Sequence, residues 1–202
     1  MDEREIVCVV DDDEGMRRSV YLLLASLGLT VKGYADGRDF LADPLIRDCG
    51  CLVTEVRMPG ISGLELQMRL IRQKLPIPVI FITGYGDVPM AVQAMRNGAI
   101  DFLPKPFNHQ VLVDKVQQAL DTSKEIRRES EQYEAVLARL ASLSRRERQV
   151  LDGVVAGKMN KVIAAELGIS LKTVESHRAS VMEKMDAASL VELVQQMGLV
   201  AR

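Results

Sequence analysis

Five short apolar runs, separated by segments with helical spacing, constrain the fold of this 202-residue chain most strongly. Each run has the length of one buried strand, and the segments between them repeat apolar side chains every three or four residues. Strands and helices that alternate through short loops predict a doubly wound, five-stranded parallel α/β sheet. The runs span residues 6–10, 30–34, 51–54, 78–82 and 100–103.

The expected helix ends carry residues that favour them. Asp36, Asp87 and Asn108 stand where a side-chain oxygen can cap the second, fourth and fifth helices. Gly28 follows the first helical stripe, and Pro76 closes the third helix. The first 120 residues therefore form the expected extent of this domain.

Polar side chains follow four of the apolar runs. Asp11 and Asp12 follow the first, Glu55 the third, Thr83 the fourth and Lys105 the fifth. Taken singly, each has an ordinary explanation: a solvated acidic loop, a turn cap or a surface lysine. Because right-handed crossovers bring all strand C-terminal ends to one edge, where α/β sheets bind ligands, we expect these five side chains to converge.

The residue types at this edge suit phosphoryl chemistry. Carboxylates with a backbone carbonyl are ligands that Mg²⁺ prefers, and Mg²⁺ also keeps several waters. A phosphoryl group in transfer carries negative charge on its equatorial oxygens, which a metal ion, an ammonium and a hydroxyl can each offset.

Residues 6–120 resemble the receiver domains of two-component response regulators in all of these strand-end motifs. The resemblance implies that Mg²⁺, or another divalent cation, is held by Asp11, Asp12, Glu55 and the carbonyl of Arg57.

The same resemblance assigns the phosphate contacts. Thr83 and Lys105 would hold phosphate oxygens, and Lys105–Pro106 would be a cis peptide bond. Phe102 would be the aromatic switch residue, although packing in the core is the simpler role for that side chain.

Glu55 departs from the family, which has Asp at the phosphoacceptor position. Its carboxylate projects one methylene farther toward the place of the phosphate. Three interpretations follow: an engineered imitation of the phosphorylated state, a natural receiver that no longer takes phosphate, or a partly active site that forms a glutamyl phosphate. The other site residues are all present, which favours an otherwise intact receiver.

Residues 121–140 are rich in charge and contain neither Gly nor Pro, which predicts a helical linker. The linker also carries apolar side chains at helical spacing, and we expect them to pack against a neighbouring domain or a second subunit. These side chains are Tyr133, Val136, Leu137, Leu140 and Leu143.

Residues 141–202 are expected to fold as four short helices. Ser144 and Glu147 form a capping box for the first helix, which ends at Gly157. Asn160 is expected to cap a second helix over residues 161–167, and Ser170 a third that runs to about Lys184. The fourth covers 189–196 and ends at Gly198. Two short helices joined by a Gly-containing turn predict a helix-turn-helix.

This segment resembles the LuxR-type DNA-binding domains, and its pairing with a receiver resembles the FixJ/NarL-type response regulators over essentially the whole chain. The motifs that carry the resemblance are Leu143-Ser-x-x-Glu147, Asn160-Lys161, Ile163-Ala164 and Thr173-Val174-Glu175-x-His177-Arg178.

The third helix of this segment has two faces. Val174, Val181 and Met185 form a core stripe, on which His177 is also expected to pack. In the family, the opposite stripe enters the major groove. That outward stripe comprises Lys172, Glu175, Ser176, Ala179 and Glu183.

Three residues of the outward stripe are expected to read bases. Glu175 suits a cytosine amino group, Ser176 a purine edge, and Ala179 a thymine methyl group. Other residues are expected to contact phosphates, which positions a protein without reading sequence. They are Lys158, Lys161, Lys172, Thr173 and Arg178, and the resemblance places Asn160 among the DNA-binding residues.

The chain is therefore expected to be a cytoplasmic transcription regulator in which a receiver (1–120) controls, through a linker (121–140), a DNA-binding domain (141–202). The resemblance implies promoter DNA, a sensor histidine kinase and RNA polymerase as partners, and a homodimer through the activated receiver. A membrane segment and an enzymatic function are not expected. Two alternatives stay open: a regulator independent of phosphorylation, and an Asp-based phosphoryl-transfer enzyme.

Charge and cysteines agree with this expectation. Residues 1–120 contain 13 basic and 16 acidic residues, whereas 141–202 contain nine and seven, which weakly indicates that the second part faces nucleic acid. The start of the chain, 1–5, is acidic and lacks the apolar core of a signal peptide. Cys8, Cys49 and Cys51 are expected to be reduced thiols.

Overall fold

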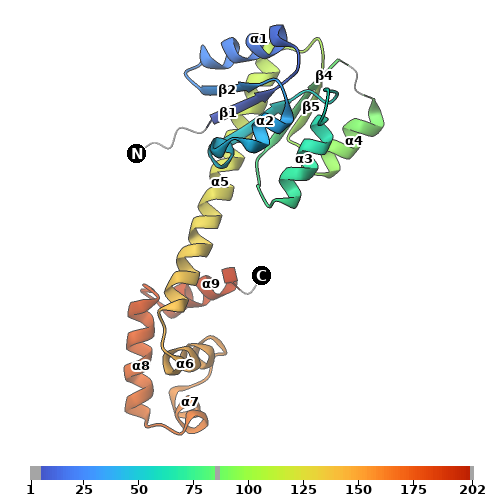
Figure 1. Ribbon diagram of the computed structural model, residues 1–202. Helices are drawn as coiled ribbons and strands as arrows, with labels where there is room; N and C mark the ends of the chain where they lie inside the picture. The colour runs from blue at the N-terminus through green and yellow to red at the C-terminus, as the bar shows by residue number, and fades with distance from the viewer. Residues whose placement is uncertain (1–5, 85–86, 201–202) are drawn as a thin grey trace. The chain divides into compact units, whose positions relative to one another are not determined.

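The computed structural model describes residues 6–84 and 87–200, so the acidic start of the chain lies outside the described part. The chain divides into two compact units, Met1–Arg127 and Arg128–Arg202. Figure 1 shows the strands gathered in the first unit, whereas α6 to α9 belong to the second. No described helix is both long and apolar enough to span a lipid bilayer.

The described part of the first unit contains one five-stranded parallel sheet in the order β2-β1-β3-β4-β5. This confirms the predicted fold. The third strand begins two residues earlier than predicted, because Cys49 pairs with Ile6 across a register shift. The last two strands each lie one residue later than predicted. The strands are β1 (Ile6–Val10), β2 (Thr30–Tyr34), β3 (Cys49–Thr54), β4 (Val79–Thr83) and β5 (Asp101–Pro104).

Helices cover both faces of the sheet (Figure 1). Side chains of α2, α3 and α4 bury one face together with Val10 and Phe81, and α1 and α5 bury the other together with Val7 and Ile80. The alternation of neighbouring strand residues between these two cores is the period of two that a buried strand requires. The helices are α1 (Glu14–Ala25), α2 (Gly37–Ala42), α3 (Gly63–Arg72), α4 (Val88–Arg96) and α5 (His109–Ala141), with a 3₁₀ turn, η1 (Pro44–Asp48).

Local hydrogen bonds explain where these helices begin. The side chains of Asp36 and Asp87 accept hydrogen bonds from first-turn amides of α2 and α4, as predicted. Asn108 accepts one from the amide of Gln110 at the start of α5. The 3₁₀ turn was not predicted from the apolar pattern, and Asp43 caps it in the same way.

The three cysteines are buried and carry free thiols, as expected. Burial raises the pKa of the Cys49 thiol well above its ordinary value, with a further contribution from the neighbouring Cys8 thiol. Both thiols pack in the same core as the buried side chains of α2, α3 and α4.

The second unit has an all-helical core to which the end of α5 contributes Val136 and Leu140. The predicted apolar stripe is divided, because Tyr133 and Leu137 are exposed on the same helix. Residues 121–140 are the continuation of α5, so the linker is helical as predicted. The remaining helices are α6 (Arg145–Val155), α7 (Asn160–Leu167), α8 (Leu171–Lys184) and α9 (Leu190–Val200).

The helix-turn-helix comprises α7 and α8, joined by Gly168, Ile169 and Ser170. Gly168 has a φ of 65°, a left-handed conformation that glycine adopts at little cost. The capping box of Ser144 and Glu147 is present, and Ser170 caps α8.

Two expected helix ends in this unit were wrong. Asn160 does not cap α7, because it is the first helical residue and the N-cap position belongs to Met159, which makes no side-chain cap hydrogen bond. Its amide oxygen instead accepts a hydrogen bond from Arg178. Helix α9 also continues through Gly198, because a glycine without a left-handed φ is tolerated inside a helix.

Gly63, the first residue of α3, allows the backbone of that helix to approach the loop after β3. A Cβ atom at this position would lie 2.3 Å from the carbonyl oxygen of Glu55 and 3.1 Å from Cε1 of Phe81. Neither neighbour is the far end of a flexible side chain, so a side chain here requires the backbone to shift.

We therefore predict that Gly63→Ala destabilises the first unit by about 1–3 kcal/mol or more. Gly37→Ala is the matched control. Gly37 is the first residue of α2 and follows the Asp36 cap, just as Gly63 is the first residue of α3 and follows the Ser62 cap. A Cβ atom added at Gly37 would make only ordinary contacts of 3.5 Å. Urea unfolding of both variants checks this. Equal midpoints for the two variants would show that the close approach at Gly63 has no energetic effect.

Candidate functional site

The C-terminal edge of the sheet brings Asp11, Glu55 and Lys105 into direct contact. The Lys105 ammonium lies 3.0 Å from Oδ2 of Asp11 and 2.8 Å from Oε2 of Glu55. Both carboxylates belong to residues that are more than nine-tenths buried. The sheet positions all three, because β1, β3 and β5 end at this edge and the amide of Lys105 donates to the carbonyl of Thr83 at 2.7 Å.

The Glu55 carboxylate is held at both oxygens. Oε1 accepts hydrogen bonds from the backbone amides of Val56, at 2.7 Å, and Arg57, at 3.3 Å. Oε2 faces the Lys105 ammonium, and the hydroxyl of Thr83 also donates to this carboxylate. The two side chains expected to hold phosphate oxygens are therefore both engaged by Glu55.

These contacts determine the charges at the site. Burial by itself would raise the pKa of Glu55, but the hydrogen bonds from Lys105 and Thr83 hold that pKa below its ordinary value. For Asp11, burial outweighs the contact with Lys105, and the pKa is raised. Burial would lower the pKa of Lys105, but the two carboxylates raise it. The favoured state is thus an ionised Glu55 paired with a protonated Lys105.

The remaining predicted site residues make no side-chain contact that joins this network. Asp12 is exposed, and Arg57 is also exposed and contributes only its backbone amide. Phe102 is half-buried and packs against Phe81, with ring centroids 6.0 Å apart, which is the core role that its position also suggested. The Lys105–Pro106 peptide bond is cis, as the resemblance implies.

Sequence reasoning missed one contact at this edge. The guanidinium of Arg17, in α1, donates to the backbone carbonyl of Asp11 at 2.7 Å and so helps to fix the loop after β1. No sequence motif indicates this pairing, because the pattern around Arg17 predicts only a polar residue on a surface helix.

The donor set suits a hard divalent cation in type. Asp11, Asp12 and Glu55 supply carboxylates, and Arg57 a backbone carbonyl. Among residues 6–84 and 87–200, no three His, Cys, Asp or Glu side chains form a group arranged to hold a metal. Mg²⁺ commonly keeps several waters in its coordination shell and so takes only part of its ligands from a protein.

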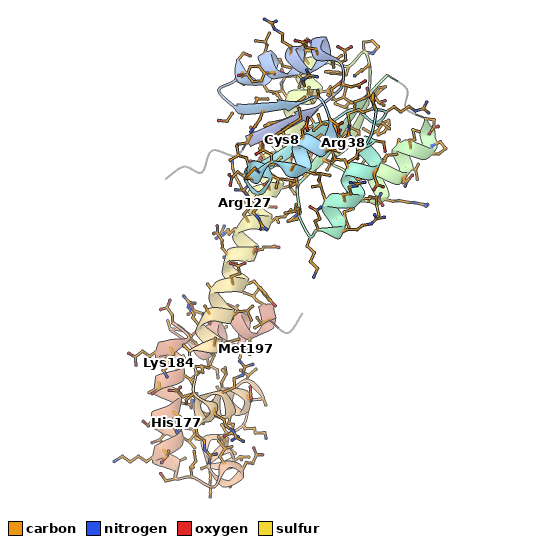
Figure 2. All side chains as sticks on the ribbon, in the orientation of Figure 1. Cys8, Arg38, Arg127, His177, Lys184 and Met197 are labelled. Atoms are coloured by element: carbon orange, nitrogen blue, oxygen red, sulfur yellow. The ribbon has the colours of Figure 1, made fainter. Side chains whose placement is uncertain are left out.

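The second unit presents the predicted outward face of α8. Val174, Val181 and Met185 are buried, and all members of the opposite stripe are exposed, which confirms the predicted orientation. His177 is half-buried midway along the helix, and Figure 2 labels it together with Lys184 near the helix end. The exposed stripe comprises Lys172, Glu175, Ser176, Ala179 and Glu183.

Glu147 connects the start of α6 to the end of α8. Its Oε2 accepts from the amide of Ser144 and from the Lys184 ammonium, each at 2.7 Å. The hydrogen bond from Lys184, followed by that from Ser144, lowers the pKa of Glu147 to about 2. The capping box was predicted, but Lys184 was not, because 37 residues separate the two partners in the sequence.

Known families match both units. Residues 7–117 match the response regulator receiver domain, and residues 141–197 match the LuxR family of bacterial regulatory proteins. This chain is a FixJ/NarL-type response regulator. It combines a receiver with a LuxR-type DNA-binding domain, and its family consists of DNA-binding transcription regulators. The alternative of a phosphoryl-transfer enzyme is not favoured.

Relatives align over nearly the whole chain. The transcriptional regulatory protein FixJ of Azorhizobium caulinodans is 49% identical over 201 residues, which are 100% of this chain and 95% of that protein. FixJ of Rhizobium meliloti is 48% identical over 93% of this chain and 92% of its own length. The solved structure of the response regulator StyR has a TM-score of 0.87 at 44% identity, and the match covers 96% of this chain and 98% of StyR.

The depressed pKa of Glu147 predicts an acid dependence for the second unit. A carboxyl group whose pKa is lower in the folded state than in the unfolded state stabilises the fold at pH values above its unfolded pKa. This stabilisation is lost as the pH falls toward the folded-state pKa. We expect the unfolding free energy to drop between about pH 4.5 and pH 2. Glu147→Gln should flatten this part of the profile, as followed by thermal unfolding of the whole chain. Lys184→Met should flatten it partly. An unchanged slope in both variants would contradict the assignment.

Proposed function

We propose that this chain regulates transcription by binding promoter DNA through α8, with a receiver whose resident anion is the Glu55 carboxylate. The observation that carries the proposal is the engagement of Lys105 and Thr83 by Glu55. A phosphoryl group at this site would need the same two donors to offset its charge. The proposal therefore favours control without phosphorylation over control by phosphoryl transfer. The family implies a cognate sensor histidine kinase upstream, and with Glu55 in place its signal would not arrive as a phosphoryl group on this residue. We propose RNA polymerase as the downstream partner.

We propose that the functional parts have the boundaries predicted from the sequence: a receiver over 1–120, a helical linker over 121–140 and a DNA-binding domain over 141–202. The family matches over 7–117 and 141–197 support the two outer parts.

A homodimer of the receiver is part of the proposal. Helix α4 exposes the apolar side chains of Val88, Val92 and Met95, and β5 lies beside this helix in the sheet unit. An exposed apolar patch on a folded domain indicates an interaction surface. We propose that two receivers pair through α4 and β5, which would place two DNA-binding domains on one site.

The first test concerns phosphorylation. Treated with acetyl phosphate, the parent should gain no phosphoryl group, because Glu55 is poorly placed as a nucleophile and its charge is already paired. Glu55→Asp should gain one, as measured by intact-mass spectrometry. In gel shifts, the affinity of the parent for promoter DNA should be the same with and without the phosphodonor, whereas the affinity of Glu55→Asp should change when the phosphodonor is added. Equal, base-labile mass gains in both proteins would rule out the proposal.

We further propose that Mg²⁺ binds at the receiver edge, with Asp11, Asp12, Glu55 and the Arg57 carbonyl as its protein ligands. Because a ligand that binds only the folded state stabilises it, Mg²⁺ should raise the thermal midpoint of the parent. Asp12→Asn should abolish the shift without disturbing the contacts of Lys105, since Asp12 is exposed. Calorimetric scans with and without Mg²⁺ check this. The same shift in both proteins would place the ion elsewhere.

The last test concerns DNA reading. Substitution of Ser176 or Ala179 should change base preference at one position in each half-site, by about 1–3 kcal/mol where a good contact is lost. Lys161→Ala or Lys172→Ala should instead weaken all sequences alike and flatten the salt dependence by about 0.9 log units per phosphate contact. Selection from a randomised site library at two salt concentrations separates these effects. If the Ser176 and Ala179 variants select the parent's sites, α8 does not read bases as proposed.

A further inference from the structure

Arg178 is the one charged residue on the buried side of α8 among the described positions. Its spacing places it between Val174 and Val181, four residues after the first and three before the second, and both of these are buried. Arg178 itself is half-buried, whereas Glu175 and Ala179 on the opposite stripe are exposed. Its long side chain must therefore leave the core side of the helix toward a neighbouring element.

That neighbour is the start of α7. Nη1 of Arg178 donates to Oδ1 of Asn160 at 2.7 Å, and this contact joins residues 18 positions apart. Asn160 is free for this role because it does not cap α7. A guanidinium has five donors in one plane, so a single hydrogen bond fixes the plane and leaves other donors for a further acceptor.

The chemistry of the partner matters. An amide is neutral, so Asn160 orients the guanidinium and leaves its positive charge uncancelled. Lys158 provides the contrast within the same unit, because its ammonium lies 2.7 Å from both carboxylate oxygens of Glu166. A cation paired with a carboxylate must give up that partner before it can release a counterion from DNA, whereas Arg178 need not.

We infer that Asn160 is a positioning residue: it holds the guanidinium of Arg178 in place for a DNA phosphate and makes no essential DNA contact of its own. This rests on the proposed function, in which the second unit binds DNA. It reassigns Asn160, which the resemblance placed among the DNA-contacting residues.

The salt dependence of DNA binding distinguishes this role from others. Loss of a phosphate contact by a cation flattens the dependence of affinity on salt by about 0.9 log units per log unit of salt. A neutral side chain that contacts DNA directly, or that only stabilises the fold, has no such effect. A flatter salt dependence after removal of the neutral Asn160 would therefore report on Arg178.

The experiment measures binding of the full chain to the duplex that the parent selects from a randomised library, over a series of salt concentrations. Arg178→Ala should flatten the slope by about 0.9 log units. Asn160→Ala should weaken binding about tenfold at low salt and flatten the slope in the same direction. Asn160→Leu, which keeps a similar side-chain shape but has no hydrogen-bond acceptor, should weaken binding and flatten the slope in the same way as Asn160→Ala. The double variant with Arg178→Ala should bind no more weakly than Arg178→Ala alone.

Lys172→Ala is the matched control, because Lys172 is exposed on the same helix and is an independent proposed phosphate contact. Its effect should add to that of Asn160→Ala, since distant sites without shared partners act independently. Additive effects of Asn160→Ala and Arg178→Ala, or an unchanged salt slope in both Asn160 variants, would overturn the inference. A parent that selects no sequence would instead overturn the proposed function.

Discussion

The receiver site depends on one ammonium group between two buried carboxylates. Asp11 and Glu55 end neighbouring strands, and without Lys105 their charges would stand unscreened in a largely buried edge of the sheet. Lys105 offsets this repulsion and keeps Glu55 ionised. The same contact occupies the Lys105 ammonium, so this edge of the sheet already holds an anion against its cation.

A comparable arrangement holds the DNA-binding unit. Glu147 accepts from the amide of Ser144, the N-cap residue of α6, and from Lys184 at the end of α8, so one carboxylate links the start of α6 to the end of α8. At the other side of α8, Arg178 reaches Asn160 at the start of α7. The outward stripe of α8 is thus presented by a helix that polar contacts fix near its middle and its end, in addition to its apolar core.

Much of this could be predicted from the sequence, because periodicity and strand-end chemistry are local signals. The five strands, the convergence of Asp11, Glu55 and Lys105, and the two faces of α8 all follow from spacing and topology. Contacts between distant positions could not be predicted, since nothing in the residues near Glu147 or Arg17 indicates their partners. Asn160 was placed as a cap because asparagine favours that position, and its tertiary contact with Arg178 overrode the local preference.

The close approach at Gly63 has a consequence for the residue that departs from the family. The first turn of α3 lies directly against the carbonyl oxygen of Glu55, where even a methyl group does not fit. The backbone at position 55 is therefore held on one side by α3, while the side-chain carboxylate of the same residue is held by Lys105 and by the amides of Val56 and Arg57. A glycine eight residues downstream thus helps to fix both ends of the residue that departs from the family.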